Sequence, residues 1–269
     1  MKSSIITIEK ISRLLLASLM LNVICMAGVS AQTTTVYARV VLQKVAPEKV
    51  QEFLTEARDI WKPAHRLRQQ NGKITNWALY LVHFTGVNDE YNYASVSYYN
   101  AWEKTEGNDN WAELMKGLDP RRVDVILAKT RSINVRHALY SRVDGTTTPP
   151  NAIPAKYFEV DYMKAKGAAA DYEKVEQDIW KPIHQTLVND GNRASWTLWR
   201  LEMPGGTGNA YDYATANAAV TYKQLLVETY EDAFKKAHPG KNPQAVFDST
   251  LKSRDLVKRE IWELVDSLN

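Results

Sequence analysis

The chain has 269 residues, 45% of them hydrophobic, so it can bury one large core or two of ordinary size. Its 34 basic and 31 acidic residues nearly cancel and form no basic clusters, which argues against a nucleic-acid-binding surface. Its only cysteine, Cys25, excludes a disulfide within the chain.

Residues 1–31 have the pattern of a secretory signal peptide. A basic segment precedes an apolar run over residues 14–26, which is too short to favour a membrane-spanning helix. Small residues at positions 29–31 predict cleavage before Gln32. We therefore expect a periplasmic or secreted protein without cysteine and without membrane attachment after cleavage. An uncleaved membrane anchor is the alternative.

The rest of the chain repeats itself. The segment Asp59–His65, with the sequence DIWKPAH, returns 119 residues later as DIWKPIH in Asp178–His184. Trp77 and Trp196 keep this offset, and later matches, such as Trp111 with Phe234 at an offset of 123, continue almost to the end of the chain. A segment rich in threonine and proline, 144–154, has the composition of a linker. We therefore predict a first repeat over 32–143 and a second over 155–269.

Each repeat predicts the same order of elements. In the first, residues 36–45 are β-branched and predict a strand, and Pro47 can begin a helix whose apolar face extends to Ala64. Asn71 and Gly72 end that helix. The remaining elements are two strands, a helical region broken near Gly117 that begins again at Pro120, and a final strand; the strands lie over 77–84, 91–99 and 133–143. The fold class is therefore α+β, with two tandem βαββαβ ferredoxin-like repeats.

A four-stranded sheet with helices on one face leaves its other face bare, and two such sheets can bury their bare faces together. The duplicated order resembles the dimeric α/β-barrel superfamily, which includes antibiotic-biosynthesis-type monooxygenases, haem-degrading monooxygenases and NIPSNAP-like proteins. The resemblance implies a pseudo-dimeric barrel within one chain. It also implies ligand pockets between helix and sheet, and oxygenase-like or isomerase-like chemistry. The Asn, Trp and His set of the haem-degrading members has no convincing equivalent in this chain, so the cofactor stays unknown.

The duplicated Trp-Lys-Pro-x-His motif supplies the candidate catalytic residues, His65 and His184. Tryptophan and histidine four positions apart share one helical face, and the proline between them bends or ends the helix. A neutral imidazole there could act as a base or as a hydrogen-bond partner. The alternative is that histidine and tryptophan only fix the helix bend. The expected ligand-binding residues beside the histidines are Trp61, Trp77, Tyr93, Trp180, Trp196 and Tyr213.

Alternation along the strands suggests a second group of candidates. We expect the helices to cover Tyr80, Val82 and Phe84 in the first repeat, and Trp199, Leu201 and Met203 in the second. The opposite face would then carry His83 and His137 in the first repeat, with His137 aligned to Glu260. It would also carry Val40 and Leu42, aligned to Glu159 and Asp161 at the same offset of 119, so the second repeat presents a charged set there. That set comprises Glu159, Asp161, Arg200, Glu202 and Glu260. Arg200 and Glu202 are included among the ligand-binding candidates.

The two histidines and these carboxylates could together bind a metal, but no short-spaced pair of ligands supports such a site, so we predict no metal site. Two functions follow. One is an exported binder of a small organic molecule, or a cofactor-poor enzyme acting on one. The other is a non-catalytic scaffold of the cell envelope. The sequence leaves open whether the protein is an enzyme and whether the pseudo-dimer associates further.

The signal peptide makes a direct prediction. When the full-length gene is expressed and the cells are fractionated, the exported fraction should contain a protein whose denatured mass begins at Gln32. Intact-mass spectrometry checks this. A mass that retains residues 1–31 in the membrane fraction would instead support the uncleaved anchor.

Overall fold

The computed structural model describes residues 35–107, 109–226 and 230–268, so the predicted signal peptide lies outside the described residues. The strands are β1 (Tyr37–Gln43), β2 (Asn76–Val82), β3 (Tyr93–Tyr99), β4 (Asn134–Gly145), β5 (Tyr157–Ala165), β6 (Ser195–Met203), β7 (Tyr213–Ala219) and β8 (Arg254–Ser267). Among the described residues, no helix is both long and apolar enough to cross a bilayer.

The helices alternate with these strands in the expected order. The first half contains the turn η1 (Pro47–Lys49), α2 (Val50–Glu56), η2 (Ala57–Trp61), α3 (Lys62–Gln70), η3 (Trp102–Glu106), α4 (Trp111–Leu114) and α5 (Pro120–Ile133). The second half contains α6 (Ala169–Val175), η4 (Glu176–Trp180), α7 (Lys181–Asn189), α8 (Tyr222–Leu225), α9 (Tyr230–Ala237) and α10 (Pro243–Ser253). The helix start at Pro47 and the restart at Pro120 agree with the sequence prediction.

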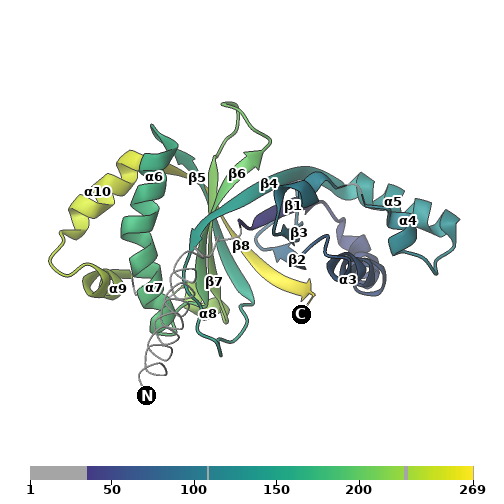
Figure 1. The fold of residues 1–269 in the computed structure, drawn as a ribbon, viewed down its shortest axis with the longest axis horizontal. Coiled ribbons are helices and arrows are strands. Elements are labelled where there is room, and N and C mark those ends of the chain that lie inside the picture. The colour runs from purple at the N-terminus through teal and green to yellow at the C-terminus, as the bar shows by residue number, and fades with distance from the viewer. Residues whose placement is uncertain (1–34, 108, 227–229, 269) are drawn as a thin grey trace, which may run out of the picture. The chain divides into compact units, whose positions relative to one another are not determined.

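All eight strands form one closed antiparallel barrel in the order β1-β3-β2-β8-β5-β7-β6-β4. The long strands β4 and β8 close it. β4 pairs with β1 of its own half and with β6 of the other, while β8 pairs with β5 and with β2. Figure 1 shows β4 crossing between the two groups of helices. The fold is therefore the α+β barrel that the sequence predicts, because each half supplies the strand that completes the other.

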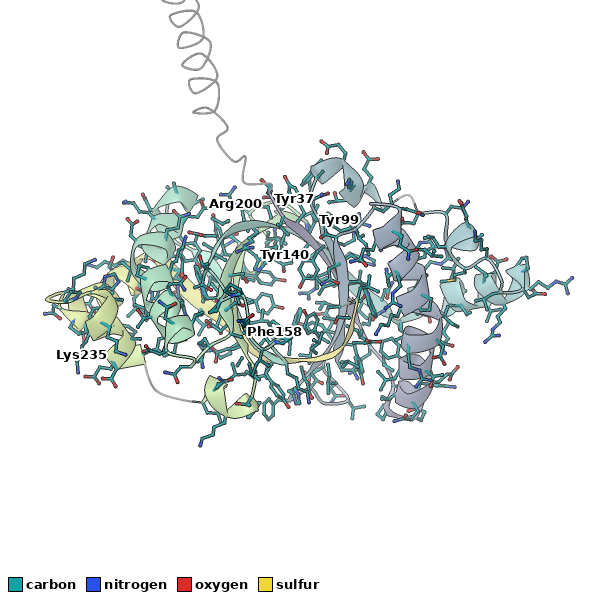
Figure 2. The ribbon with its side chains drawn as sticks, turned by 60° about the horizontal axis from the view of Figure 1, so that its bottom comes forward. Tyr37, Tyr99, Tyr140, Phe158, Arg200 and Lys235 are labelled. Carbon is teal, nitrogen blue, oxygen red and sulfur yellow. The ribbon has the colours of Figure 1, made fainter. Side chains whose placement is uncertain are left out.

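The helices lie outside the barrel, on opposite sides of it. Figure 2 looks along the barrel and shows Tyr140 and Phe158 inside the ring of strands. Interior side chains include Val40, Leu42 and Tyr80 from the first half and Val160 from the second. Trp77, Leu79 and their neighbours point outward and pack beneath the helices.

This arrangement reverses the predicted strand faces. Tyr80 and Val82 belong to the barrel interior, and Trp199 packs against the same core, so the helices do not cover them. The last residues of the two expected triplets, Phe84 and Met203, are exposed at 84% and 53%. The cause is that the bare face of one sheet is apolar enough to resemble a helix-covered face. Alternation then left the opposite face, with its polar groups, uncovered, whereas in the structure His137, Glu159 and Asp161 line pockets between helix and sheet.

The error in the first strand has a different origin. The sequence alignment placed Val40 and Leu42 opposite Glu159 and Asp161 at an offset of 119. In the structure, Tyr37 pairs with Tyr99 just as Tyr157 pairs with Ala219, so the offset in these strands is 120 and Val40 corresponds to Val160. Because side chains alternate, a slip of one residue moves every one of them to the other face. Glu159 and Asp161 therefore lie on the helix side.

The barrel interior is not completely filled. A cavity of about 270 Å³ lies inside it, lined by uncharged side chains. Side chains that line such a space have no packing partners on that side, so the contacts that they make within the wall matter for stability.

Substitution of Trp262 on β8 tests how much the contacts within the barrel wall contribute to stability. It is buried, its ring centroid lies 5.5 Å from that of Tyr80, and its indole N–H donates to Glu260 at 2.9 Å. Trp262→Ala should lower the free energy of unfolding by about 3–5 kcal/mol, because it removes an aromatic group that joins β8 to β2. Urea denaturation measures this.

The control is Val257→Ala on the same strand, where the side chain is 44% exposed. It should change stability by no more than about 0.5 kcal/mol. Equal losses in the two variants would contradict the assignment of Trp262 to the barrel wall.

Candidate functional site

The long helix of each half, which packs against the outside of the barrel, contains one π-helical turn, and this turn lies at the same place in both halves. In the first half, the π-helical turn η2 separates α2 from α3, and the Lys62 N–H bonds to the carbonyl of Ala57, five residues earlier. Pro63 has no N–H to donate, which accounts for the interruption. The second half repeats this at η4, where the backbone N–H of Lys181 bonds to the backbone carbonyl of Glu176. Such turns often mark functional positions in helices, and both candidate histidines follow directly.

In the first half, the space between helix and sheet forms a pocket of about 290 Å³, the N-half pocket. His65 stacks on Trp77 with ring centroids 4.8 Å apart and planes 16° apart, and Trp61 and Trp111 stand at its edges. The motif tryptophan, the motif histidine and Trp77 therefore meet as the sequence predicted. Tyr93 does not join them, because it packs on Phe53.

Nδ1 of His65 is already paired with Arg68, although Nε of Arg68 itself is buried without a partner among the described residues. The Arg68 guanidinium lies 3.0 Å from Nδ1 of His65, and since arginine can only donate, Nδ1 accepts and the proton is on Nε2. Arg68 also forms a buried ion pair with Asp109 at 2.8 Å. Burial, and secondarily the charge of Arg68, hold the pKa of His65 well below its usual range. These contacts give His65 the surroundings of a structural histidine.

The second half contains the equivalent C-half pocket, of about 430 Å³. His184 stacks on Trp196 with ring centroids 5.1 Å apart and planes 7° apart, and Trp180 lies beside it. Tyr230 contacts His184 edge-on, as Trp111 contacts His65. The sequence alignment had matched Trp111 with Phe234, so this pairing is corrected.

His184 differs from His65 in its hydrogen bonds. The repeat position of Arg68 is occupied by Leu187, which is buried and cannot donate. Nδ1 of His184 is consequently buried without a hydrogen-bond partner among the described residues. Burial, followed by the charges of Arg193 and Arg254, lowers the pKa of His184 to about 3. The ring is therefore neutral and has an unused polar atom, which is costly unless a ligand uses it.

Two carboxylate–arginine pairs line the C-half pocket. Asp161 accepts two hydrogen bonds from Arg259, at 2.6 and 2.8 Å, and Glu176 accepts one from Arg254 at 3.0 Å. Burial raises the pKa of Glu176 to about 6, against the opposing effect of Arg254. A carboxyl group that titrates near neutrality can take up and release protons at working pH.

A third carboxylate, Glu159, stands in the same pocket and has its pKa raised, first by burial and then by the nearby charge of Asp161. The side-chain N–H of Asn217 donates to it at 3.3 Å, while the Asn217 side-chain oxygen is buried without a partner among the described residues. The C-half pocket is thus lined by three carboxylates and three arginines. Three of its polar atoms are buried without a partner among the described residues: Nδ1 of His184, Nε of Arg193 and the side-chain oxygen of Asn217.

The remaining predicted residues lie elsewhere. Tyr213 packs on Tyr172 and donates its hydroxyl to Glu173 at 2.7 Å, so it supports the pocket wall from outside. Arg200 pairs with the same Glu173, and Glu202 accepts a hydrogen bond from Ser141. None of these three residues lines the barrel cavity, the N-half pocket or the C-half pocket. Their assignment as ligand-binding residues stays a prediction, which these positions do not support.

The two strand histidines are also separated. Nε2 of His83 lies 2.8 Å from Glu263, whereas His137 lines the N-half pocket. His137 pairs with Val41 as Arg259 pairs with Asp161, so its counterpart is Arg259 and not Glu260. Within the described part of the chain, no three histidine, cysteine or acidic side chains are grouped to hold a metal ion.

Sequence reasoning missed Glu176, although a signal was present. Glu176 occupies the repeat position of Ala57, on the apolar face of the predicted helix. A carboxylate on such a face is rarely buried unless it is paired. The partner, Arg254, begins the last strand and is 78 residues away, so its contribution could not be read from local spacing.

The buried state of His184 predicts a pH effect. Its pKa is about 3 in the folded chain against 6.5 for an ordinary histidine, so below pH 6.5 the unfolded chain gains a proton that the folded chain does not. This stabilising contribution is complete above pH 6.5 and falls as the pH drops towards 3. Between pH 7 and pH 5, the wild type should lose about 2 kcal/mol more than His184→Gln. Urea titrations at both pH values measure the difference.

Glu176 acts in the opposite direction, since its raised pKa stabilises the folded state below pH 4.5 and this effect is lost as the pH rises through 6. It is present in both proteins, so the comparison isolates His184. Equal losses in the two proteins would show that His184 is not held neutral.

No protein-family model and no curated protein matches this sequence. Solved structures do match it over most of its length. A protein from Fusobacterium nucleatum subsp. nucleatum, provisionally named a monooxygenase, has a TM-score of 0.53 at 10% identity, covering 88% of this chain and 95% of its own.

Two further structures are similar at lower scores. An anthrone oxidase-like protein has a TM-score of 0.49 at 11% identity, covering 89% of this chain and 95% of its own. A protein provisionally named a chlorite dismutase has a TM-score of 0.47 at 13% identity, covering 87% and 96%. At identities this low, the structural similarity shows only that the fold is shared. That fold is a ferredoxin-type α+β arrangement around an eight-stranded barrel.

Proposed function

We propose that the protein is exported and binds a small organic molecule in the C-half pocket, where Glu176 exchanges a proton with that molecule. The observation that carries the proposal is the combination of a buried carboxyl group with a pKa of about 6 and a neutral His184 whose Nδ1 is unpaired. Polar groups left unpaired in a lined pocket are what a ligand would satisfy.

Each group has a distinct role in this proposal. Ionised Glu176 removes a proton from an acidic C–H or O–H of the ligand, and Arg254 holds the carboxylate in place. His184 accepts or donates one hydrogen bond to a ligand oxygen, because a ring with a pKa of about 3 stays neutral and is a weak base. Trp180, which lines the same pocket beside His184, offers apolar surface to the rest of the molecule.

The reaction class is isomerase-like or oxygenase-like. A cofactor-poor reaction of either kind can begin when the substrate loses a proton to Glu176, so the same carboxylate serves either. In the oxygenase-like form, dioxygen is the oxidant that the resulting carbanion reduces. The provisional monooxygenase name of the Fusobacterium protein favours the oxygenase-like form by resemblance. Proton removal itself requires no cofactor. Of the two motif histidines, His184 and not His65 is the one that we propose contacts the ligand.

We also propose that the chain is a tandem duplication that acts as its own dimer. In support, β1–β4 and β5–β8 have the same order and the same pairings within each half. The two pockets would then descend from one, with the first retaining a structural Arg68 and the second acquiring Glu176. A dimeric relative would have two identical pockets, and this chain has two different ones.

The proposal is tested by a thermal-shift screen of small carbonyl and phenolic compounds against purified protein. A compound that raises the melting temperature of the wild type should raise it less for His184→Gln, because that variant loses the imidazole contact. Where the compound is turned over, Glu176→Gln should lower kcat by about 10²–10⁴-fold, the usual contribution of an acid–base group. Steady-state kinetics and the melting shifts are the measurements.

The matched control is His65→Gln in the N-half pocket, which should leave the ligand shift and kcat within about twofold. Loss of function in His65→Gln alone would move the site to the first half. If no compound shifts the wild type and all three variants only melt earlier, the protein is a scaffold of the cell envelope, the alternative that the sequence raised.

A further inference from the structure

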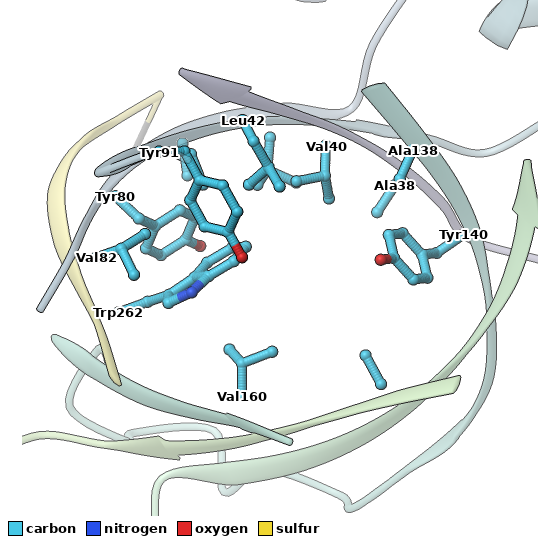
Figure 3. Packing of buried hydrophobic residues seen from close by; sticks show 14 of the residues in the cluster. Ala38, Val40, Leu42, Tyr80, Val82, Tyr91, Ala138, Tyr140, Val160 and Trp262 are labelled. Atoms are coloured by element: carbon cyan, nitrogen blue, oxygen red, sulfur yellow. The ribbon is translucent and has the colours of Figure 1, made fainter. Parts of the chain in front are cut away.

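The cavity inside the barrel is a separate space from the two helix–sheet pockets. The sheet lies between them, because alternate residues of each strand face the interior while the others face the helices. Figure 3 shows Tyr140, Val160 and Trp262 pointing inward from different strands around a central space. The cavity measures about 270 Å³.

Its lining is uncharged throughout, and eight of its twenty residues are aromatic. The aromatic members are Tyr80, Tyr98, Tyr140, Phe158, Tyr162, Trp199, Tyr211 and Trp262. Small residues fill the gaps, among them Ala38, Ala138, Ala214 and Ala216. Flat rings separated by alanines leave slots in which another flat ring can stack.

The polar atoms near the cavity are mostly bonded to one another. Tyr140 donates to Tyr211 at 3.3 Å, and the hydroxyls of Tyr80 and Tyr98 are 3.4 Å apart. Two lining residues, Tyr162 and Trp262, donate to the carboxylate of Glu260, at 3.1 and 2.9 Å. Lys258 also pairs with Glu260, at 2.7 Å.

The interior therefore offers no free charge to a charged ligand, whose transfer out of water would be uncompensated. Tyrosine hydroxyls can each accept one more hydrogen bond, so a single neutral polar group can be accommodated. Size sets the other limit. An apolar cavity of roughly 150 Å³ holds benzene, so this one has room for a second fused ring.

We propose that the barrel interior is a second binding site, for a neutral, flat aromatic molecule of about two fused rings with at most one hydroxyl. This site is independent of the C-half pocket, because the two spaces are lined by opposite faces of the strands and share almost no residues. The protein would then bind two chemically different molecules, one apolar in the barrel and one polar beneath the helices.

The test uses 2-naphthol as the probe and isothermal titration calorimetry on the purified protein. Binding is expected, and naphthalene-2-sulfonate, which has the same rings and a charge, should bind at least tenfold more weakly. Ala138→Leu and Ala214→Leu place extra methyl groups in the cavity and should each weaken 2-naphthol binding at least tenfold. The matched control Ala245→Leu, on an exposed face of α10, should leave it unchanged.

Crystals of the wild type grown with 6-bromo-2-naphthol locate the site without any variant, so the test stands even if a cavity-filling variant fails to fold. The bromine anomalous peak should lie among Tyr80, Tyr140 and Phe158. The proposal is overturned if 2-naphthol does not bind, if the sulfonate binds equally well, or if bromine lies only beneath the helices.

Discussion

The exchange of long strands between the two halves is the constraint on which this structure depends. β4 completes a sheet with β6 of the second half, and β8 completes one with β2 of the first. Neither half could close a barrel alone, and each would expose an apolar sheet face and an unpaired strand edge. Closure fixes the faces of all eight strands at once. It puts one set of side chains around an inner cavity and the other beneath two groups of helices, so every candidate site follows from it.

Within that symmetric frame, single substitutions make the two helix–sheet pockets different. Both keep a π-helical turn and a histidine stacked on a tryptophan. Arg68 satisfies the first histidine, whereas Leu187 leaves the second with a free Nδ1. Ala57 is replaced by Glu176, which then needs Arg254. The shared features are explained by packing, because they recur where the polar surroundings do not. The differences give the second pocket its acid–base character.

The interior of the barrel differs from both helix–sheet pockets, because its lining is uncharged. Aromatic side chains from both halves surround a space that packing has left open. Hydroxyl pairs and the saturated Glu260 remove any need for solvent there. A cavity whose lining polar groups are already hydrogen-bonded has the properties of an apolar binding site. It contrasts with the charged C-half pocket on the outer face of the same strands.

The sequence by itself determined the α+β class, the order of the elements, the duplicated motif and the meeting of Trp61, His65 and Trp77 with their counterparts. These features depend on local periodicity and on the internal repeat, both of which can be read directly from the sequence. It could not determine which strand face lies inside, because both faces are rich in aromatic residues and one inserted residue shifts the alignment of the first strands. Nor could it place Tyr93, Tyr213, Arg200 or Glu202 outside the pockets, or bring Arg254 to Glu176. Those facts were decided by the tertiary structure, because barrel closure sets strand register and joins residues far apart in the chain.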